Sequence, residues 1–397
     1  MAEPTGRPRK AAAPKASGKR APARGKPAAP RVSGTSAARA ATGKPAAPQA
    51  SGKPVAPQAS GKPAAARASG KTTALNTNRR ASQPAVRAGA SPAPDTVAVG
   101  DGEAGPGTRS RLDVRKTYKL YIGGAFPRSE SGRSYPVATP GGALLAHAAR
   151  ASRKDARDAV VAARKAGPGW AGATAYNRGQ VLYRVAELLQ GRAAQFAEEI
   201  VKNEGLSAPK AAQAVAEAID RWVWYAGWPD KVAQVAGAAN PVAGPYFNFS
   251  VPEPTGVVAV LAPPESGLLG LVSVLAPVIA TGNTAVVVAS EPAPLPAVTL
   301  AEVLATSDVP GGVVNILTGR LAELAPVLAA HMDVNAIDLT GAAPGDRAEL
   351  ERLAAGNVKR VFAAGAGWVA EDWADAPGLA RMLAFLETKT VWHPIGT

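Results

Sequence analysis

The chain has 397 residues, and its 45 Lys and Arg residues against 30 Asp and Glu residues give a formal net charge of +15. It contains no cysteine and three histidines, which excludes disulfide bonds, thiolate metal sites and thiol nucleophiles and leaves too few imidazoles for a metal cluster. The sequence has no apolar run of about 18 residues and no apolar segment near its N-terminus, so we expect no membrane span, no secretory signal and a cytoplasmic location.

The first part of the chain, residues 1–110, is predicted to be a disordered basic tail. Residues 1–100 hold 18 of the 45 basic residues but two of the 30 acidic ones. A nine-residue repeat, first seen as "GKPAAPQAS", begins at Gly43, Gly52 and Gly61. Such a composition cannot bury enough apolar surface to offset the entropy lost on ordering. Two roles stay open for the tail: binding nucleic acid or another polyanion through its cations, or keeping the protein soluble.

From Lys119 onwards the pattern is that of a folded protein. "KLYIGGAFPRS" predicts a short strand or hairpin that turns at Gly123–Gly124. In "SRKDARDAVVAARKA", Ser152 and Asp155 have the spacing of a helix capping box. A helical stripe follows in "NRGQVLYRVAELLQGRAAQFAEEIVKNEG", with Gly205 as the expected stop. The next predicted helix, "APKAAQAVAEAIDRWVWYAGW", carries an aromatic cluster that we interpret as core packing: Trp222, Trp224, Tyr225 and Trp228.

Strands and helices then alternate along the chain. The predicted strands are Val257–Ala262, Ala285–Val288, Val313–Ile316, Ala336–Leu339 and Val358–Phe362. The predicted helices are Leu268–Ile279, Ala297–Thr306, Ala322–Ala330 and Asp346–Ala355. Nearly continuous apolar strands separated by helices predict an α/β fold, a Rossmann-like parallel sheet covered on both faces. Ligands of such sheets bind at the carboxyl ends of the strands, so we expect any chemistry in the loops after Ala262, Val288, Gly319 and Thr340.

Several stretches, taken in order, resemble the aldehyde dehydrogenase superfamily: "YIGGAF", "DARDAVVAARKAGPGW", "NRGQVLYRVAELL", "EPTGVVAVLAPPESGLLG", "APVIATGNTAVVVASEPAPLP", "VPGGVVNILTG" and "IDLTGA". They cover about Tyr118 to Val361. The resemblance implies a Rossmann-like NAD(P) domain over residues 111–370, with an oligomerisation arm of β-strands at about residues 230–253. It implies a short remnant over residues 371–397, in which "LETKTV" is similar to the family's C-terminal oligomerisation strand. It also implies NAD or NADP as the cofactor and oxidation of an aldehyde through a thiohemiacetal.

The catalytic groups that the resemblance implies are not matched in this sequence. That chemistry needs a thiolate nucleophile, a general base and an amide donor for the oxyanion. Cysteine is absent. Glu265 stands where the family has the Asn that helps to hold the oxyanion, and a carboxylate would repel the developing charge. Ala364 aligns with the general base, so we expect no intact catalytic site.

The cofactor positions are matched in part. Val288 replaces a family Lys, and Leu321 and Ala325 replace glycines that lie close to the cofactor phosphates. NAD(P) binding is therefore expected to be weak or lost. The residues that still match the family's cofactor-binding positions, and that would form a vestigial site, are Ser290, Glu291, Gly319, Thr340 and Gly341.

We therefore expect a pseudoenzyme, a non-catalytic subunit that forms a hetero-oligomer with a full-length aldehyde dehydrogenase paralogue or associates with itself. The physical motive is the exposure of strand edges and apolar faces that a catalytic domain would cover. One alternative is an NAD(P)-dependent oxidoreductase with an altered active site, in which Glu265 and Glu291 act as acid–base groups and Ser266 as the nucleophile. A second alternative is a protein that associates with nucleic acid or another polyanion through its basic tail.

Overall fold

The computed structural model describes residues 114–363 and 372–396. The chain divides into two units, Met1–Gly100 and Asp101–Thr397, and all of the described residues belong to the second. The predicted tail and Ala364 lie outside the described residues, so their predictions stay untested. None of the described helices is both long and apolar enough to cross a lipid bilayer.

The centre of the described unit is a five-stranded parallel sheet with the strand order β10-β9-β6-β7-β8. Its strands are β6 (Val257–Leu261), β7 (Thr284–Val288), β8 (Val314–Leu317), β9 (Ala336–Asp338) and β10 (Arg360–Phe362). Every residue of β6 and β7 is buried. These apolar strands are buried because helices cover both faces, which is the usual arrangement of a parallel sheet. The five predicted strands and the predicted fold class are confirmed.

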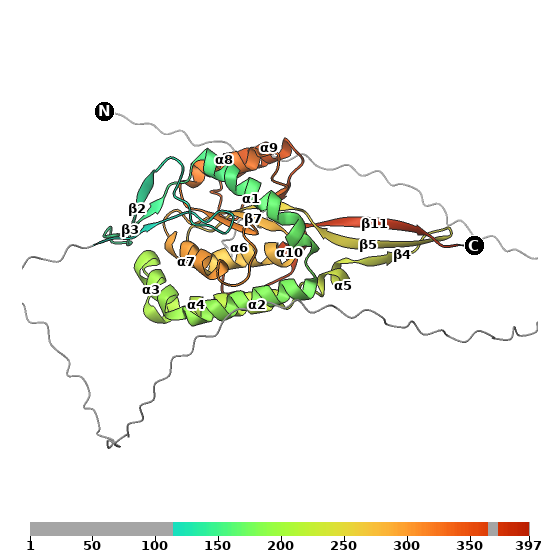
Figure 1. Cartoon of the computed structure of the whole chain (residues 1–397), viewed down its shortest axis with the longest axis horizontal. Helices are drawn as coiled ribbons and strands as arrows, with labels where there is room; N and C mark the ends of the chain where they lie inside the picture. Colours follow the sequence, from blue (N-terminus) through green and yellow to red (C-terminus); the bar gives the residue numbers. More distant parts are fainter. Residues whose placement is uncertain (1–113, 364–371, 397) are drawn as a thin grey trace, which may run out of the picture. The chain divides into compact units, whose positions relative to one another are not determined.

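Two layers of helices flank the sheet (Figure 1). Alternate residues of β6 point to opposite faces: Val258 and Val260 belong to one core cluster, and Val257 and Ala259 to the other. The first cluster is closed by α2 (Ala175–Gly191), α3 (Ala193–Glu204), α4 (Ala208–Ala226), α6 (Leu269–Ala280) and α7 (Leu295–Leu304). The second is closed by α1 (Arg153–Gly172), α8 (Leu321–Ala330) and α9 (Arg347–Ala355).

The helix boundaries follow from local signals, with one difference from the prediction. The Ser152 hydroxyl accepts hydrogen bonds from backbone N–H groups of the first turn of α1, and the Asp155 carboxylate accepts one from the backbone N–H of Ser152, so the capping box is present. The stripe that we predicted to end at Gly205 is divided at Arg192 into α2 and α3. Gly205 ends α3 with φ of +74°, a conformation that favours glycine.

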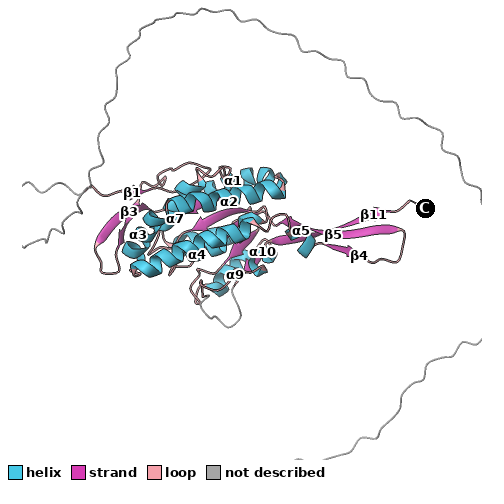
Figure 2. Cartoon of the chain, turned by 90° about the horizontal axis from the view of Figure 1, so that it is seen from below, coloured by secondary structure: helices cyan, strands magenta, loops and turns pink. Residues whose placement is uncertain are grey.

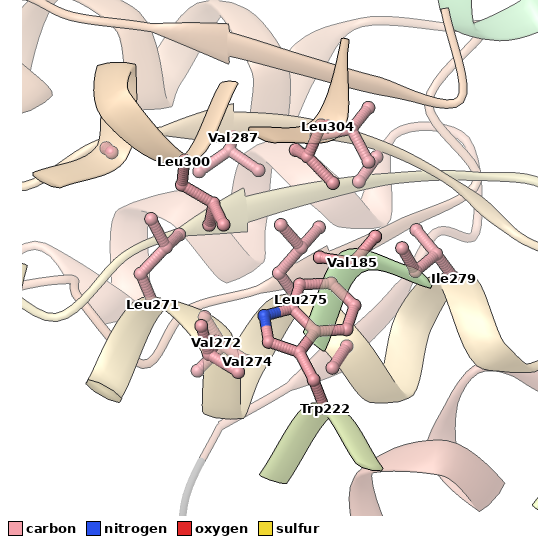
Figure 3. Close-up of a cluster of buried hydrophobic side chains, with 14 of the residues drawn as sticks. Val185, Trp222, Leu271, Val272, Val274, Leu275, Ile279, Val287, Leu300 and Leu304 are labelled. Atoms are coloured by element: carbon pink, nitrogen blue, oxygen red, sulfur yellow. The ribbon is translucent and has the colours of Figure 1, made fainter. Parts of the chain in front are cut away.

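The predicted aromatic cluster packs in the core. Trp222 of α4 is fully buried and lies among Val185 of α2 and Leu275 and Ile279 of α6 (Figure 3). Tyr225 is also buried, while Trp224 and Trp228 pack against the cluster from a partly buried position. The helices α2 and α4 lie side by side in both views of the chain (Figures 1 and 2).

A small sheet with the order β1-β3-β2 lies at the N-terminal side of the described unit; it contains β1 (Thr117–Tyr118), β2 (Ser134–Ala138) and β3 (Leu144–Ala149). The predicted turn at Gly123–Gly124 is present, because Ile122 and Ala125 pair across it. Tyr121 then pairs with Ile316, which joins this segment to the edge of the central sheet at β8.

The third sheet forms an arm with the strand order β11-β5-β4. It follows the short helix α5 (Val232–Ala236) and contains β4 (Ala238–Asn240), β5 (Tyr246–Pro254) and β11 (Leu386–Pro394). The antiparallel pairing of β5 and β11 covers all nine residues of each strand, from Leu386 opposite Pro254 to Pro394 opposite Tyr246. The C-terminal strand therefore pairs with the predicted arm of its own chain. The three strands extend together from the helical layers (Figure 1).

The segment between the sheet and β11 is short but well packed. It contains the five-residue helix α10 (Ala380–Ala384), followed by the fully buried ring of Phe385. That ring lies 6.0 Å from the ring of Phe362 on the edge strand β10. Met382 of α10 is also buried in the core cluster that contains α6. The described part of this segment thus covers apolar surface that we expected to be left exposed.

Candidate functional site

A cleft of about 780 Å³ lies at the carboxyl ends of β6, β7 and β9. Its walls come from the loops after these strands, from β2 and from the start of α8, and most of the lining side chains are apolar. This is the place where a parallel α/β sheet binds its ligands. Four of the predicted site residues line the cleft together with Glu265: Ser290, Glu291, Thr340 and Gly341. Gly319 is not among the lining residues.

The loop after β7 is held by the side chain of Ser290. Its hydroxyl donates a hydrogen bond to the carbonyl oxygen of Pro264 at 2.8 Å and accepts one from the backbone N–H of Ala293 at 3.1 Å. Ser290 therefore ties the loop after β6 to the loop after β7. Its donor is used within the protein and is not directed to a ligand.

The carboxylate of Glu291 lies at the N-terminus of helix α8. Its Oε2 accepts a hydrogen bond from the backbone N–H of Leu321, the first residue of that helix, at 3.2 Å. A carboxylate at this position is stabilised by the helix dipole. Tyr135 of β2 donates its hydroxyl to the carbonyl oxygen of Glu291 at 3.4 Å, and the pKa of Tyr135 is raised, first by burial and then by the charge of Glu291.

The loop after β9 is organised around a buried carboxylate. Asp338 Oδ1 accepts hydrogen bonds from the backbone N–H of Thr340 at 3.0 Å and from its hydroxyl at 2.5 Å. Asp338 Oδ2 is paired with the guanidinium of Arg381 on α10. We did not single out either charged residue from the sequence, although an aspartate inside the apolar strand pattern "AIDL" was a usable signal of a buried pair.

The two glycines predicted for cofactor binding have structural reasons to be glycine. A Cβ atom at Gly341 would lie 2.1 Å from the carbonyl oxygen of Ala262, so only glycine permits this approach to the end of β6. Gly319 has φ of +147° and packs closely against the backbone of Ala151. Their presence in the sequence is thus explained by backbone packing.

Glu265 faces a residue from the far end of the chain. Its Oε1 accepts a hydrogen bond from the indole N–H of Trp373 at 3.2 Å, and both residues line the cleft. Trp373 is held in turn by Arg221 of α4, which donates to the carbonyl oxygen of Trp373 at 2.7 Å. Ser266, the candidate nucleophile, accepts a hydrogen bond from the backbone N–H of Gly270, in the first turn of α6, at 2.9 Å.

A second carboxylate, Glu204 at the end of α3, lies behind the same loop. Its Oε1 accepts a hydrogen bond from the backbone N–H of Gly267 at 3.0 Å. Burial raises the pKa of Glu204 to about 7, and the hydrogen bond from Gly267 opposes this shift. Nothing in the local sequence distinguishes Glu204 from the other acidic residues of this amphipathic helix, so sequence reasoning missed it.

The cleft contains few groups that could carry catalysis. None of the three histidines lines it. No group of three His, Asp or Glu side chains within residues 114–363 and 372–396 is arranged to hold a metal ion. The residues Val288 and Ala325, which replace family residues near the cofactor, are both buried in the core, and Leu321 lines the cleft.

Three comparisons with known proteins agree on one family. The family model described as "Aldehyde dehydrogenase family" matches residues 126–369. Retinal dehydrogenase 2 of Gallus gallus is 32% identical over 261 residues, which are 64% of this chain and 50% of that protein. Mitochondrial benzaldehyde dehydrogenase of Antirrhinum majus is 32% identical over 248 residues, or 61% of this chain and 46% of that protein.

Solved structures show the same similarity. PnpE from Pseudomonas sp. WBC-3 is 28% identical with a TM-score of 0.58, over 62% of this chain and 50% of that one. The NAD+ complex of an aldehyde dehydrogenase from Bacillus cereus is 25% identical with a TM-score of 0.58, over the same two fractions. The chain spans about half the length of the relatives it matches.

Proposed function

This chain belongs to the aldehyde dehydrogenase family, and we propose that it is a subunit without catalytic activity of its own that assembles with a full-length aldehyde dehydrogenase. The observation that carries the proposal is the absence of cysteine from all 397 residues. Oxidation through a thiohemiacetal needs a thiolate. The cleft hydroxyl that donates to a carboxylate is that of Thr340, and its acceptor, Asp338, is already paired with the guanidinium of Arg381. We also propose a cytoplasmic location.

The position of the Glu265 carboxylate at the cleft supports the proposed loss of catalytic activity. A developing oxyanion is stabilised by neutral or positive donors placed about 3 Å away. Glu265 instead brings a carboxylate to the loop after β6, and its hydrogen bond to Trp373 holds that carboxylate at the wall of the cleft. The alternative in which Ser266 acts as a nucleophile is disfavoured because its hydroxyl accepts a hydrogen bond from the backbone N–H of Gly270 and Ser266 is not among the residues that line the cleft.

The arm supports the assembly part of the proposal. The strand β11 is an edge of the arm sheet, and an edge strand offers unpaired N–H and C=O groups to another chain. Large aromatic side chains are exposed on the same strands: Trp392 is 58% exposed, Phe247 52% and Tyr246 42%. Tyr and Trp are enriched at protein interfaces. A full-length relative would supply the half of the family's length that this chain does not span.

We propose that NAD or NADP binds weakly or not at all. The residues kept at the cofactor positions make hydrogen bonds within the chain, and Leu321 places a side chain on the wall of the cleft. Thermal unfolding of the purified chain should therefore shift by less than about one degree with millimolar NAD+ or NADP+. A shift of several degrees would show that the site is retained.

Two experiments test the main proposal. The purified chain is incubated with NAD+ or NADP+ and a panel of aldehydes, and we expect no reduced cofactor above background. Native mass spectrometry of the complex purified from the source cells should then report a larger aldehyde dehydrogenase bound to this chain. Turnover by the chain alone would overturn the catalytic part, and recovery of the chain alone or as a homo-oligomer would overturn the assembly part.

A second role is carried by the tail and is compatible with the first. The excess of basic residues in residues 1–100 favours binding to nucleic acid or another polyanion through counterion release. Binding to double-stranded DNA should fall steeply between about 50 and 200 mM salt and be lost when residues 1–110 are deleted. Equal binding by the full chain and the deleted chain would exclude this role.

A further inference from the structure

Another cavity, of about 540 Å³, lies at the base of the arm, where α5, β5 and β11 meet the end of α1 and the start of α2. Figure 1 shows this junction between the arm and the helical layers. The cavity lies at the amino ends of β6 and β7, because its lining residues Pro254 and Thr281 come shortly before these strands. It shares no lining residue with the cleft at the carboxyl ends. Its volume is in the range of small-molecule sites.

Arg178 of α2 lines this cavity as a cation that has no carboxylate partner among the described residues. Its Nη1 donates to the backbone carbonyl oxygens of Ala171 and Ala173, at the end of α1, at 3.3 and 2.5 Å. Its Nε has no hydrogen-bond partner in the part of the chain that the structure describes. Burial lowers the pKa of Arg178, and no carboxylate opposes this shift. Because a guanidinium stays protonated at any ordinary pH, a partly buried positive charge is left uncompensated.

The other polar side chains of the lining already have partners within the chain. The hydroxyl of Thr281 donates to the carbonyl oxygen of Val278 at 2.8 Å. Glu253 is paired with Lys389 at 2.9 Å, and both side chains are about half exposed. The remaining lining residues are apolar or glycine. Among the polar groups of this lining, the guanidinium of Arg178 is therefore the one that a ligand can satisfy.

We propose that this cavity binds a small aliphatic carboxylate, with its charged group at the guanidinium of Arg178 and its hydrocarbon chain against the apolar wall. A buried charge is costly without a partner, and the planar fork of a guanidinium matches a carboxylate. The apolar wall, which includes Val232, Pro252 and Leu386, favours a hydrocarbon chain behind a single charge over a polyphosphate.

This inference goes beyond the proposed function, because assembly with a relative requires no ligand. Oxidation of an aldehyde yields a carboxylic acid, so a full-length partner would supply a ligand of this class. That source rests on the proposed function, whereas the site itself does not.

Hexanoate, hexan-1-ol and hexylamine test the proposal because they share one chain length and differ in the head group. Each is titrated into the full chain by isothermal calorimetry near neutral pH and at fixed ionic strength, without aldehyde, cofactor or partner. We expect a dissociation constant in the millimolar range or below for hexanoate and at least about tenfold weaker binding for hexan-1-ol, which lacks the charge-assisted hydrogen bonds. Hexylamine, which carries the same charge as Arg178, should not bind. Acetate should bind at least about tenfold more weakly than hexanoate, because it lacks the methylene groups that the apolar wall would bury.

Two substitutions place the ligand in this cavity. Arg178→Gln should weaken hexanoate binding at least about tenfold, because the charge is removed. Arg184→Gln is the matched control, since Arg184 is on the same helix, is 50% exposed and does not line the cavity, and it should leave the affinity unchanged. Ala233→Phe should abolish binding, because it fills the cavity from α5 while it keeps the guanidinium.

The proposal is overturned if hexan-1-ol binds as tightly as hexanoate, or if hexanoate shows no binding up to millimolar concentration. It is also overturned if either Arg178→Gln or Ala233→Phe binds hexanoate as the native chain does. Should loss of the contacts with α1 prevent Arg178→Gln from folding, Ala233→Phe decides, because it leaves these contacts in place. Since neither aldehyde nor partner is present, these outcomes are separate from the turnover and assembly experiments.

Discussion

The guanidinium of Arg381 on α10 is paired with the carboxylate of Asp338 on β9. Asp338 is fully buried and the side chain of Arg381 is 8% exposed. The same guanidinium donates to the hydroxyl of Thr340 at 3.0 Å and lies 4.3 Å from the ring centroid of Phe362. A charge buried in a parallel sheet is tolerated only with a partner, so the short segment that leads to β11 supplies the cation that the carboxylate at the end of β9 needs.

Replacement of Arg381 by Met should therefore be strongly destabilising. The carboxylate of Asp338 would stay buried without its cation, and removing one member of a buried pair costs about 3–5 kcal/mol. Urea denaturation of the full chain, followed by tryptophan fluorescence, measures this change. The double variant Asp338→Asn/Arg381→Met should recover much of the loss, because the buried negative charge is then removed as well.

The matched control is Arg360→Met. Arg360 is paired with Glu387, but both side chains are more than 40% exposed, and such surface pairs contribute less than about 1 kcal/mol. If Arg381→Met costs no more than Arg360→Met, the pair with Asp338 does not have the role argued for it.

The raised pKa of Glu204 predicts that the unfolding free energy of the chain depends on pH. Its pKa is raised to about 7 in the folded chain, mainly by burial, whereas an unfolded glutamate titrates near its ordinary value. Between these two values the folded chain binds more protons than the unfolded chain. The contribution of Glu204 is therefore fully present below the ordinary pKa and is lost as the pH rises through about 7.

The variant Glu204→Gln lacks this titration. Relative to the native chain it should gain about 2 kcal/mol of unfolding free energy between pH 5 and pH 8, as measured by denaturant unfolding at each pH. Glu198→Gln, on the exposed side of the same helix, is the control. The pKa of Glu198 is lowered by its hydrogen bond to Lys202, so it stays ionised throughout this window and its difference from the native chain should be flat. A flat difference for Glu204→Gln would contradict the prediction.

The central sheet could be predicted because its signal is local. Strands such as β6 and β7 are apolar at every position, helices with amphipathic stripes alternate with them, and the family motifs coincide with the same turns. The cleft could be located by the same reasoning, since the carboxyl ends of parallel strands lie at one edge.

The use of the polar groups could not be predicted, because it depends on contacts between distant parts of the chain. Glu265 and Trp373 are separated by 108 positions, and Asp338 and Arg381 by 43. Ser290 and Gly341 stay predicted cofactor positions, and the contacts that the sequence did not show are the hydrogen bond of Ser290 to Pro264 and the backbone packing of Gly341. The division between α2 and α3 at Arg192 was also missed, since the apolar stripe continues across it.

Trp222 offers a test of core packing. It is fully buried, and its indole N–H has no hydrogen-bond partner among the described residues. Trp222→Ala should cost about 3–5 kcal/mol, because a large cavity would remain among Val185, Leu275 and Ile279 (Figure 3). Trp222→Phe should cost clearly less, since it keeps an aromatic ring and removes the unsatisfied donor. Equal costs in urea denaturation would show that ring packing does not dominate at this position.

A substitution on the arm should affect assembly with a partner much more than it affects the stability of the chain itself. Trp392 of β11 is 58% exposed and contacts Tyr246 of β5, with the ring centroids 5.7 Å apart. Trp392→Ser should change the unfolding free energy of the chain by about 1 kcal/mol, the value typical of an exposed aromatic pair.

If the arm binds a full-length relative, the same change should weaken that complex about thirtyfold, because buried interface tryptophans contribute about 2 kcal/mol or more. Met332→Ser in the loop between α8 and β9, which is 69% exposed and outside the arm strands, is the control. Native mass spectrometry should find the complex with the Met332 variant and lose it with the Trp392 variant, and an unchanged complex in both would place the interface elsewhere.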